Sequence, residues 1–301
     1  MKGLELSKAF FEECGLPLLR RQFPELLPRL AIGLVGSGSE CFGYDDEISQ
    51  DHDFEPGFCI FLPEDVDRQT EFLLERAYAK LPKSFHGFTR CSQTPVGGNR
   101  HGVLRLGDFL ESKTGSRDGR LTLQDWLTLP EQSLLEATNG ELFLDESGAF
   151  TQIRQNLSYF PEDIRRKRLA GNLLLMGQAG QYNYPRCLAR QDTGAAQLAA
   201  IEFARSAMHT AFLLAGRYMP YYKWQFTALR AFEPELADRL ETLISTAGNK
   251  TAQIEAICAH FVAKLETLTG SSTSELEQQA YLLNNTICDG QVRNLHILSG
   301  V

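Results

Sequence analysis

The sequence predicts an α+β fold, with an N-terminal mixed sheet and its helices followed by a C-terminal all-α helical bundle. Within the first 150 residues, short apolar runs typical of strands alternate with helical segments. From Phe150 to about Leu268, almost every segment is compatible with helix and no convincing strand occurs. We therefore expect an α+β domain over residues 1–149, a helical bundle over 150–270 and a C-terminal appendix over 271–301.

The elements of the N-terminal part follow from apolar spacing and from turn residues. A helix is expected over Ser7–Phe23 with Ser7 as its cap, then a strand over Leu30–Val35. The turn Gly36–Ser39 ends this strand and opens a short helix near Glu40. The other expected elements are a strand over His52–Leu62, a helix over Pro63–Lys80, a loop over Leu81–Gly102, a strand over Gly102–Leu106, helices over Thr122–Leu127 and Pro130–Ala137, and a strand over Glu141–Asp145.

The second half of the chain reads as a bundle of helices. Apolar residues from Ile201 to Ala215 repeat at intervals of three and four, which is typical of a helix that buries one stripe. The expected helices are Thr151–Tyr159, Pro161–Gln181, Ala195–Arg217, Tyr221–Phe232, Pro234–Ser245 and Thr251–Leu268.

Composition limits the classes of partner. The net charge of -8 argues against a broad grip on nucleic acid, so DNA is not an expected partner. The seven cysteines are odd in number and form no C-x-x-C pair, which favours reduced thiols in a cytoplasmic protein. The N-terminus lacks the apolar core of a signal peptide, and no stretch is long enough to span a bilayer. We expect a cytoplasmic protein without a membrane partner.

One motif carries chemistry. Eleven residues after the Gly36–Ser39 turn comes the triplet Asp51-His52-Asp53. Residues two apart on a strand face the same way, so Asp51 and Asp53 would present two carboxylates that a cation must neutralise. The small residues of the turn leave backbone N–H groups open to an anion such as phosphate. The alternative reading of the aspartates is a solvated acidic loop, because Asp45 and Asp46 lie nearby.

Common phosphate and metal signatures are excluded by spacing. Cys41 stands where a dinucleotide fingerprint needs its third glycine, and no Gly-Lys-Ser/Thr element exists. An EF-hand loop beginning at Asp51 would need glycine and glutamate where Pro56 and Leu62 stand.

The remaining pattern resembles the nucleotidyltransferase superfamily, the DNA polymerase beta-like fold, and in particular a bacterial nucleotidyltransferase-like family of unassigned function. The resemblance spans roughly residues 30 to 230. The segments that carry it are Gly36-Ser37-Gly38-Ser39-Glu40, Gly43-Tyr44-Asp45-Asp46-Glu47-Ile48-Ser49, Asp51-His52-Asp53, Leu121-Thr122, Asp125-Trp126-Leu127, Pro130-Glu131-Gln132, Pro161-Glu162-Asp163-Ile164-Arg165 and Arg217-Tyr218-Met219-Pro220-Tyr221-Tyr222-Lys223-Trp224.

The resemblance implies that Asp51 and Asp53 hold Mg²⁺ or Mn²⁺ and act catalytically on a nucleoside triphosphate (NTP). It also implies that the turn residues Gly36, Ser37, Gly38 and Ser39 bind the phosphates. The implied reaction transfers a nucleoside monophosphate to the hydroxyl of an unidentified acceptor and releases pyrophosphate. A small molecule or a protein is the favoured acceptor over RNA. The alternatives are a noncatalytic nucleotide-binding or regulatory protein on the same fold, and a protein-interaction module.

Two further residues are candidates for this site. Active relatives commonly add a third carboxylate from a following strand, but Gly102–Leu106 contains no acid, and Asp108 is the nearest substitute. Asp108 and the later Asp145 also read as helix caps. Lys223 lies in a cluster of aromatic residues and would reach the triphosphate, or else is simply solvated.

Overall fold

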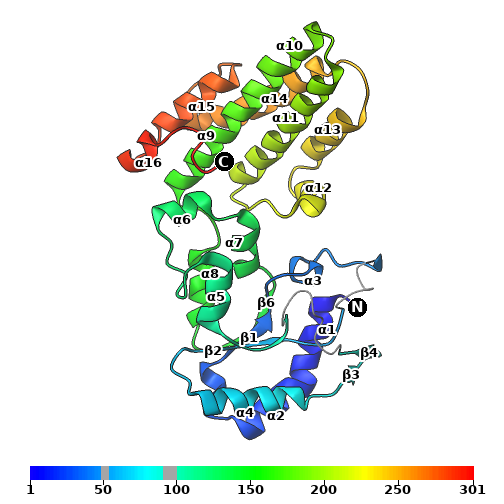
Figure 1. Cartoon of the computed structure of the whole chain (residues 1–301), viewed down its shortest axis with the longest axis vertical. Coiled ribbons are helices and arrows are strands. Elements are labelled where there is room, and N and C mark those ends of the chain that lie inside the picture. The colour runs from blue at the N-terminus through cyan, green and yellow to red at the C-terminus, as the bar shows by residue number, and fades with distance from the viewer. Residues whose placement is uncertain (49–53, 91–99) are drawn as a thin grey trace. The chain divides into compact units, whose positions relative to one another are not determined.

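The computed structural model describes residues 1–48, 54–90 and 100–301 of the chain. These residues form two compact units (Figure 1). The first unit comprises Met1–Leu121 and Gln132–Ser158, and the second comprises Thr122–Glu131 and Tyr159–Val301. All strands lie in the first unit, and beyond β6 the described chain contains only helices and connections. The expected α+β class with a helical C-terminal part is confirmed.

The first unit is built on a four-stranded mixed sheet with the order β5-β2-β1-β6. β1 is antiparallel to both β2 and β6, whereas β2 and β5 are parallel. A separate hairpin joins β3 to β4. The strands are β1 (Ala31–Leu34), β2 (Cys59–Leu62), β3 (Ser84–Phe85), β4 (Phe88–Thr89), β5 (Gly102–Arg105) and β6 (Glu141–Asp145).

Helices pack around this sheet and close its core. The central strands read Ala-Ile-Gly-Leu and Cys-Ile-Phe-Leu and are buried along their whole length. One apolar cluster joins them to the helices that precede and follow them, and it includes Phe10, Phe58, Ile60 and Leu74. The helices of this unit are α1 (Gly3–Phe10), α2 (Leu16–Gln22), α3 (Ser39–Phe42), α4 (Arg68–Ala79), α5 (Leu106–Thr114), most of α7 (Glu131–Thr138) and α8 (Ala149–Asn156).

The second unit is a bundle organised on α9 and α11, which pack against each other. α9 continues through a π-helical stretch, Gly177–Asn183, into α10. α15 packs along α9, so residues 271–301 belong to this bundle. Its helices are α6 (Leu123–Thr128), α9 (Glu162–Met176), α10 (Tyr184–Ala189), α11 (Thr193–Leu214), α12 (Gln225–Arg230), α13 (Pro234–Ser245), α14 (Thr251–Thr269), α15 (Leu276–Asn285) and α16 (Gly290–Asn294).

Two buried lysine side chains form hydrogen bonds inside the bundle. The Lys167 side chain is fully buried on α9, and its ammonium donates to Asn284 Oδ1 at 2.8 Å and to the Leu295 carbonyl at 2.7 Å. Lys250 is also buried and donates to the Leu243 carbonyl at the end of α13. Burial is tolerable because each ammonium meets carbonyl oxygens in place of water.

Several expected boundaries were wrong. Ser7 does not cap a helix: α1 begins at Gly3, and the buried Ser7 hydroxyl donates to the Gly57 carbonyl. β2 begins only at Cys59, and residues 54–58 do not belong to a strand. α4 begins after Asp67, whose carboxylate accepts from two backbone N–H groups, and not at Pro63.

Two elements were missed. The segment expected as a loop from Leu81 contains the β3–β4 hairpin, and α5 follows β5 without a break. Among the described residues, no helix combines the length and the apolar character that a membrane span requires.

Candidate functional site

The Gly36–Ser39 turn leaves the sheet at the carboxyl end of β1. The antiparallel register sets Gly33 opposite Cys59, so Phe54–Phe58 enter β2 at this same edge of the sheet. β5 is parallel to β2, and Gly102 N–H donates to the Phe58 carbonyl. The starts of β2 and β5 therefore lie at the edge of the sheet where the turn follows β1.

The backbone of the turn has a conformation that requires glycine. Gly36 has φ 107°, and Gly38 has φ 123° with ψ 144°, a region that side chains other than hydrogen rarely allow. The Asn139 side chain fixes Gly36: its Oδ1 accepts from Gly36 N–H at 2.8 Å, and its Nδ2 donates to Gly36 O at 2.7 Å. These two hydrogen bonds hold the backbone of Gly36 in place.

Three successive backbone N–H groups of the turn lack an acceptor among the described residues. Within the described part of the chain, the backbone N–H groups of Ser37, Gly38 and Ser39 donate to no protein acceptor. Successive N–H groups in a turn that contains left-handed glycines form a concave anion-binding nest. This is the feature of the turn that points to a ligand.

A lysine and a glutamate meet at the Ser37 side chain. The Ser37 hydroxyl donates to Glu136 Oε2 at 2.8 Å, and Lys113 Nζ lies 2.5 Å from the same oxygen and 3.2 Å from Ser37 Oγ. Burial alone would raise the pKa of Glu136. Hydrogen bonds from Lys113, Gln132 and Ser37 outweigh burial and lower it, so this carboxyl stays ionised at neutral pH.

An arginine covers the other side of the turn. Arg100 Nη2 donates to the Ser37 carbonyl at 2.8 Å and is ion-paired with Glu40 in α3. A Cβ at Gly38 would lie 1.7 Å from this nitrogen, so the guanidinium lies directly against the glycine. Arg100 and Lys113 therefore place two cations at the turn, and the carboxylates of Glu40 and Glu136 are among their partners.

The expected metal ligands Asp51 and Asp53 lie outside the described residues. In the parts that the structure describes, His, Cys, Asp and Glu side chains form no group of three that could hold a metal ion. Two carboxylates are hard oxygen ligands of the kind that Mg²⁺ prefers, so their chemistry fits the implied ion. Phe54, which follows Asp53 directly, lies beside Gly3 at the start of α1: a Cβ on Gly3 would contact both Phe54 and Glu40, which belongs to α3.

Asp108 is separated from the turn. It lies in the first turn of α5, after the end of β5 that pairs with Leu62 at the opposite edge of the sheet. Lys113, five residues later, faces the turn, and five residues rotate a helical side chain by about 140°. The Asp108 carboxylate is exposed and pairs with Arg117 at 2.6 Å.

Asp145 also lies at the opposite edge of the sheet. It pairs with Ala31 at the start of β1, whereas the turn follows the end of that strand. Its carboxylate accepts from the N–H and the hydroxyl of Thr151 at the start of α8. Asp145 is not the N-cap residue of α8, which is Gly148, but its carboxylate satisfies a backbone N–H of the first turn of that helix.

Lys223 lies in the helical unit. It is exposed in a 3-10 turn, Tyr222–Trp224, and its Nζ lies 4.5 Å from the Trp224 ring centroid. This is a cation–π distance. Tyr221 and Tyr222 precede Lys223 in the chain, and their ring centroids lie 4.3 Å apart.

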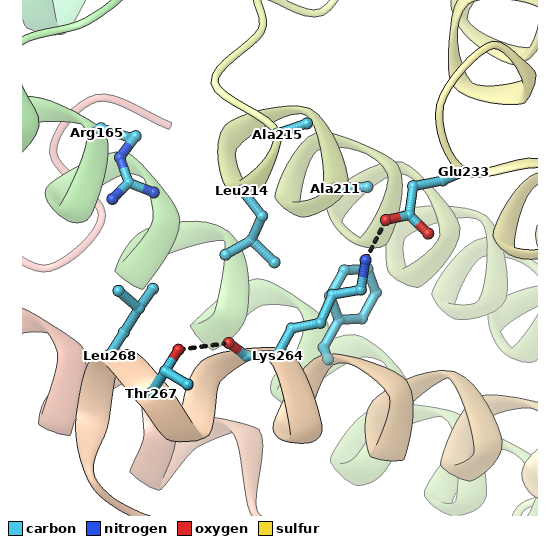
Figure 2. A pocket seen from close by; sticks show the side chains of 9 residues that line it. Arg165, Ala211, Leu214, Ala215, Glu233, Lys264, Thr267 and Leu268 are labelled. Atoms are coloured by element: carbon cyan, nitrogen blue, oxygen red, sulfur yellow. Dashed lines mark hydrogen bonds and ion pairs between the residues drawn. The ribbon is translucent and has the colours of Figure 1, made fainter.

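The helical unit also contains a pocket of about 330 Å³ (Figure 2). Its lining is apolar apart from two cations and a few polar groups. Both cations are neutralised, because Arg165 binds Glu162 at 2.6 Å and Lys264 is ion-paired with Glu233. We assign no ligand to this pocket. The residues that line it are Arg165, Ala211, Leu214, Ala215, Glu233, Phe261, Lys264, Thr267 and Leu268.

Sequence reasoning found the turn but missed the side chains around it. Lys113 became identifiable only with α5, because its place opposite Ser37 depends on a helix that the sequence pattern did not predict. Glu136 and Asn139 come from the end of α7, about 100 residues after the turn, and no local motif links them to it.

Comparison with known proteins gives one match. A family model described as "Domain of unknown function (DUF4037)" matches residues 126–225, a third of the chain that excludes the Gly36–Ser39 turn. No curated protein and no solved structure matches the chain.

Proposed function

We propose that this protein binds a nucleoside triphosphate with Mg²⁺ or Mn²⁺ at the Gly36–Ser39 turn and transfers its nucleoside monophosphate to an acceptor hydroxyl. The observation that carries the proposal is a row of three backbone N–H groups in the turn that donate to no acceptor within the described part of the chain. Arg100 and Lys113 lie beside this row. A polyphosphate presents oxygen acceptors and negative charge, which match N–H donors and cations.

The two cations can exchange partners. Arg100 pairs with Glu40, and Lys113 pairs with Glu136. Phosphate oxygens offer both cations an alternative partner, and Ser37 and Ser39 add hydroxyl groups. Side-chain exposures of 23% for Arg100 and 20% for Lys113 leave both within reach of a ligand in solution.

The proposed metal ligands are Asp51 and Asp53. An ion held by these carboxylates would neutralise phosphate charge and polarise the α-phosphorus toward attack by the acceptor hydroxyl. The chain's own contribution is to hold and orient the β- and γ-phosphates on the turn, so that pyrophosphate is the leaving group. The proposed acceptor is a small molecule or a protein, and the proposed compartment is the cytoplasm.

A noncatalytic nucleotide-binding protein is the second candidate. Asp108 and Asp145 bind other partners, Arg117 and Thr151. Glu40 and Glu136, the carboxylates seen at the turn, are each paired with a cation. Neither of these two carboxylates is therefore available as a base for the acceptor while its ion pair persists. This observation favours binding without turnover.

Labelled nucleotides distinguish the two candidates. We expect label from α-³²P-NTP to move to a component of a cell extract in the presence of Mg²⁺, whereas γ-³²P-NTP gives no transfer. Asp51→Asn and Asp53→Asn should abolish transfer. A rise in melting temperature with NTP and Mg²⁺, but without transfer to any acceptor, would establish the noncatalytic binder. The absence of any shift with all four NTPs and either metal would refute both and leave an interaction module.

A further inference from the structure

The helical unit exposes an aromatic and cationic segment that the turn does not explain. Tyr222 is 70% exposed and Tyr221 is 46% exposed, and Lys223 between Tyr222 and Trp224 also faces solvent. The Tyr221 ring lies 4.3 Å from the Tyr222 ring and 6.3 Å from the Trp224 ring, measured between centroids. The Tyr221 ring is tilted by 48° against the Tyr222 ring and by 71° against the Trp224 ring. The three rings and the Lys223 ammonium thus form one aromatic and cationic cluster.

A buried ionic cluster holds this segment in place from below. The Glu131 carboxylate, only 7% exposed, accepts from Met219 N–H at 2.6 Å and from His209 Nε2 at 2.5 Å. Arg168 adds a cation 3.6 Å away. Burial would raise the pKa of Glu131, but the charges of His209 and Arg168 and the hydrogen bonds outweigh it and lower the pKa. The backbone just before Pro220 is therefore anchored to the core.

A second hydrogen bond holds the backbone at Pro220. Gln225 Nε2 donates to the Pro220 carbonyl at 3.1 Å and closes the chain into a tight turn before α12. Hydrogen bonds thus hold the backbone on the amino-terminal side of Tyr221 and Tyr222, whose rings are exposed. Aromatic side chains on a backbone that hydrogen bonds hold in place lose little conformational entropy when a ligand covers them.

We propose that Tyr221, Tyr222 and Lys223 form a platform that stacks a nucleobase and binds its attached phosphate. Aromatic side chains stack on any base through its π face, and a neighbouring cation supplies the phosphate contact. The ligand class rests on the proposed function, because a nucleotide is the ligand inferred for the turn. The arrangement of the platform is argued from contacts described within the helical unit.

Trp224 is a built-in reporter for this platform. The chain contains two tryptophans, so Trp126→Phe leaves Trp224 as the sole source of tryptophan emission. We expect titration of this variant with AMP, without divalent metal, to quench Trp224 emission saturably. Adenosine should quench more weakly because it lacks the phosphate for Lys223, and ribose 5-phosphate should not quench because it lacks the base.

Substitutions locate the effect. Adding Tyr222→Ala to Trp126→Phe should weaken AMP binding by about tenfold, the loss typical of one stacking ring. Adding Lys223→Met should abolish the advantage of AMP over adenosine. The matched control is Tyr281→Ala, which removes another half-exposed tyrosine of the same unit and should change nothing. No quenching by AMP, or quenching equally weakened by Tyr281→Ala, would overturn the platform.

The two proposals fail separately. If Asp51→Asn abolishes the metal-dependent NTP shift while AMP still quenches Trp224, both sites are supported. If no NTP shift exists but AMP quenching depends on Tyr222, the platform stands and the turn proposal falls. If the NTP shift is intact and AMP quenching is absent, the platform falls alone.

Discussion

The two units of this chain differ in how they hold cationic side chains that are buried wholly or in part. In the helical unit, Lys167 and Lys250 are buried completely and donate to backbone carbonyls. In the sheet unit, Arg100 and Lys113 keep a fifth of their surface exposed and pair with carboxylates at a glycine turn. A cation fixed on carbonyls stabilises one architecture, whereas a cation paired with a carboxylate at the surface can change partners. The difference separates scaffold from candidate site.

The largest expected effect tests the scaffold side. Lys167→Met leaves Asn284 Oδ1 and the Leu295 carbonyl without their donor inside the bundle. We expect the free energy of unfolding of the helical unit to fall by about 3 kcal/mol, measured by urea denaturation with circular dichroism. Lys113→Met is the matched control and should cost under about 1 kcal/mol. Equal losses in both variants would remove the distinction between the two kinds of cation.

The next effect depends on pH and concerns the ionic cluster beneath Tyr221. The pKa of Glu131 lies below its ordinary value near 4.5, so the ionised form is favoured by folding. Its contribution is therefore present above pH 4.5 and is lost as the pH falls through the lowered pKa. Glu131→Gln should destabilise the protein by about 2 kcal/mol at pH 7, and the difference from wild type should shrink below pH 4. A constant difference between pH 7 and pH 3.5 would contradict this role.

A smaller effect is expected at the turn itself. Gly38→Ala places a methyl group against the Arg100 guanidinium in a backbone region that only glycine adopts easily. We expect a loss of about 1–2 kcal/mol in stability together with loss of the NTP-dependent rise in melting temperature. Gly43→Ala is the control: Gly43 also has positive φ, but a Cβ there meets no atom within 4 Å. An unchanged nucleotide shift in Gly38→Ala would count against the nest.

The sequence allowed prediction of the turn, the strands β1 and β6 and the helical half, because these depend on local patterns. Glycine and serine after an apolar run announce a tight turn whatever packs on it. The residues around the turn were not predictable in this way. Lys113, Glu136 and Asn139 reach Gly36 and Ser37 only through tertiary contacts across 76 to 103 positions of the chain. The roles of Lys167 and Glu131 likewise depend on which buried oxygen or donor each meets, which spacing does not reveal.

The smallest expected effect concerns Asp108, the nearest substitute for the third acid that the family resemblance implies. Asp108 pairs with Arg117 on an exposed face, and Arg117 also binds Glu64 and Glu111. Asp108→Asn should therefore leave Arg117 held by two carboxylates and change stability by less than about 0.5 kcal/mol. The NTP-dependent melting shift and any label transfer should remain at wild-type level, because this side chain faces away from Ser37. Glu136→Gln, the contrasting variant, removes the charge that holds Lys113 at the turn and should alter the nucleotide shift. If Asp108→Asn abolished label transfer while Glu136→Gln did not, the site would have to be moved from the turn toward the start of α5.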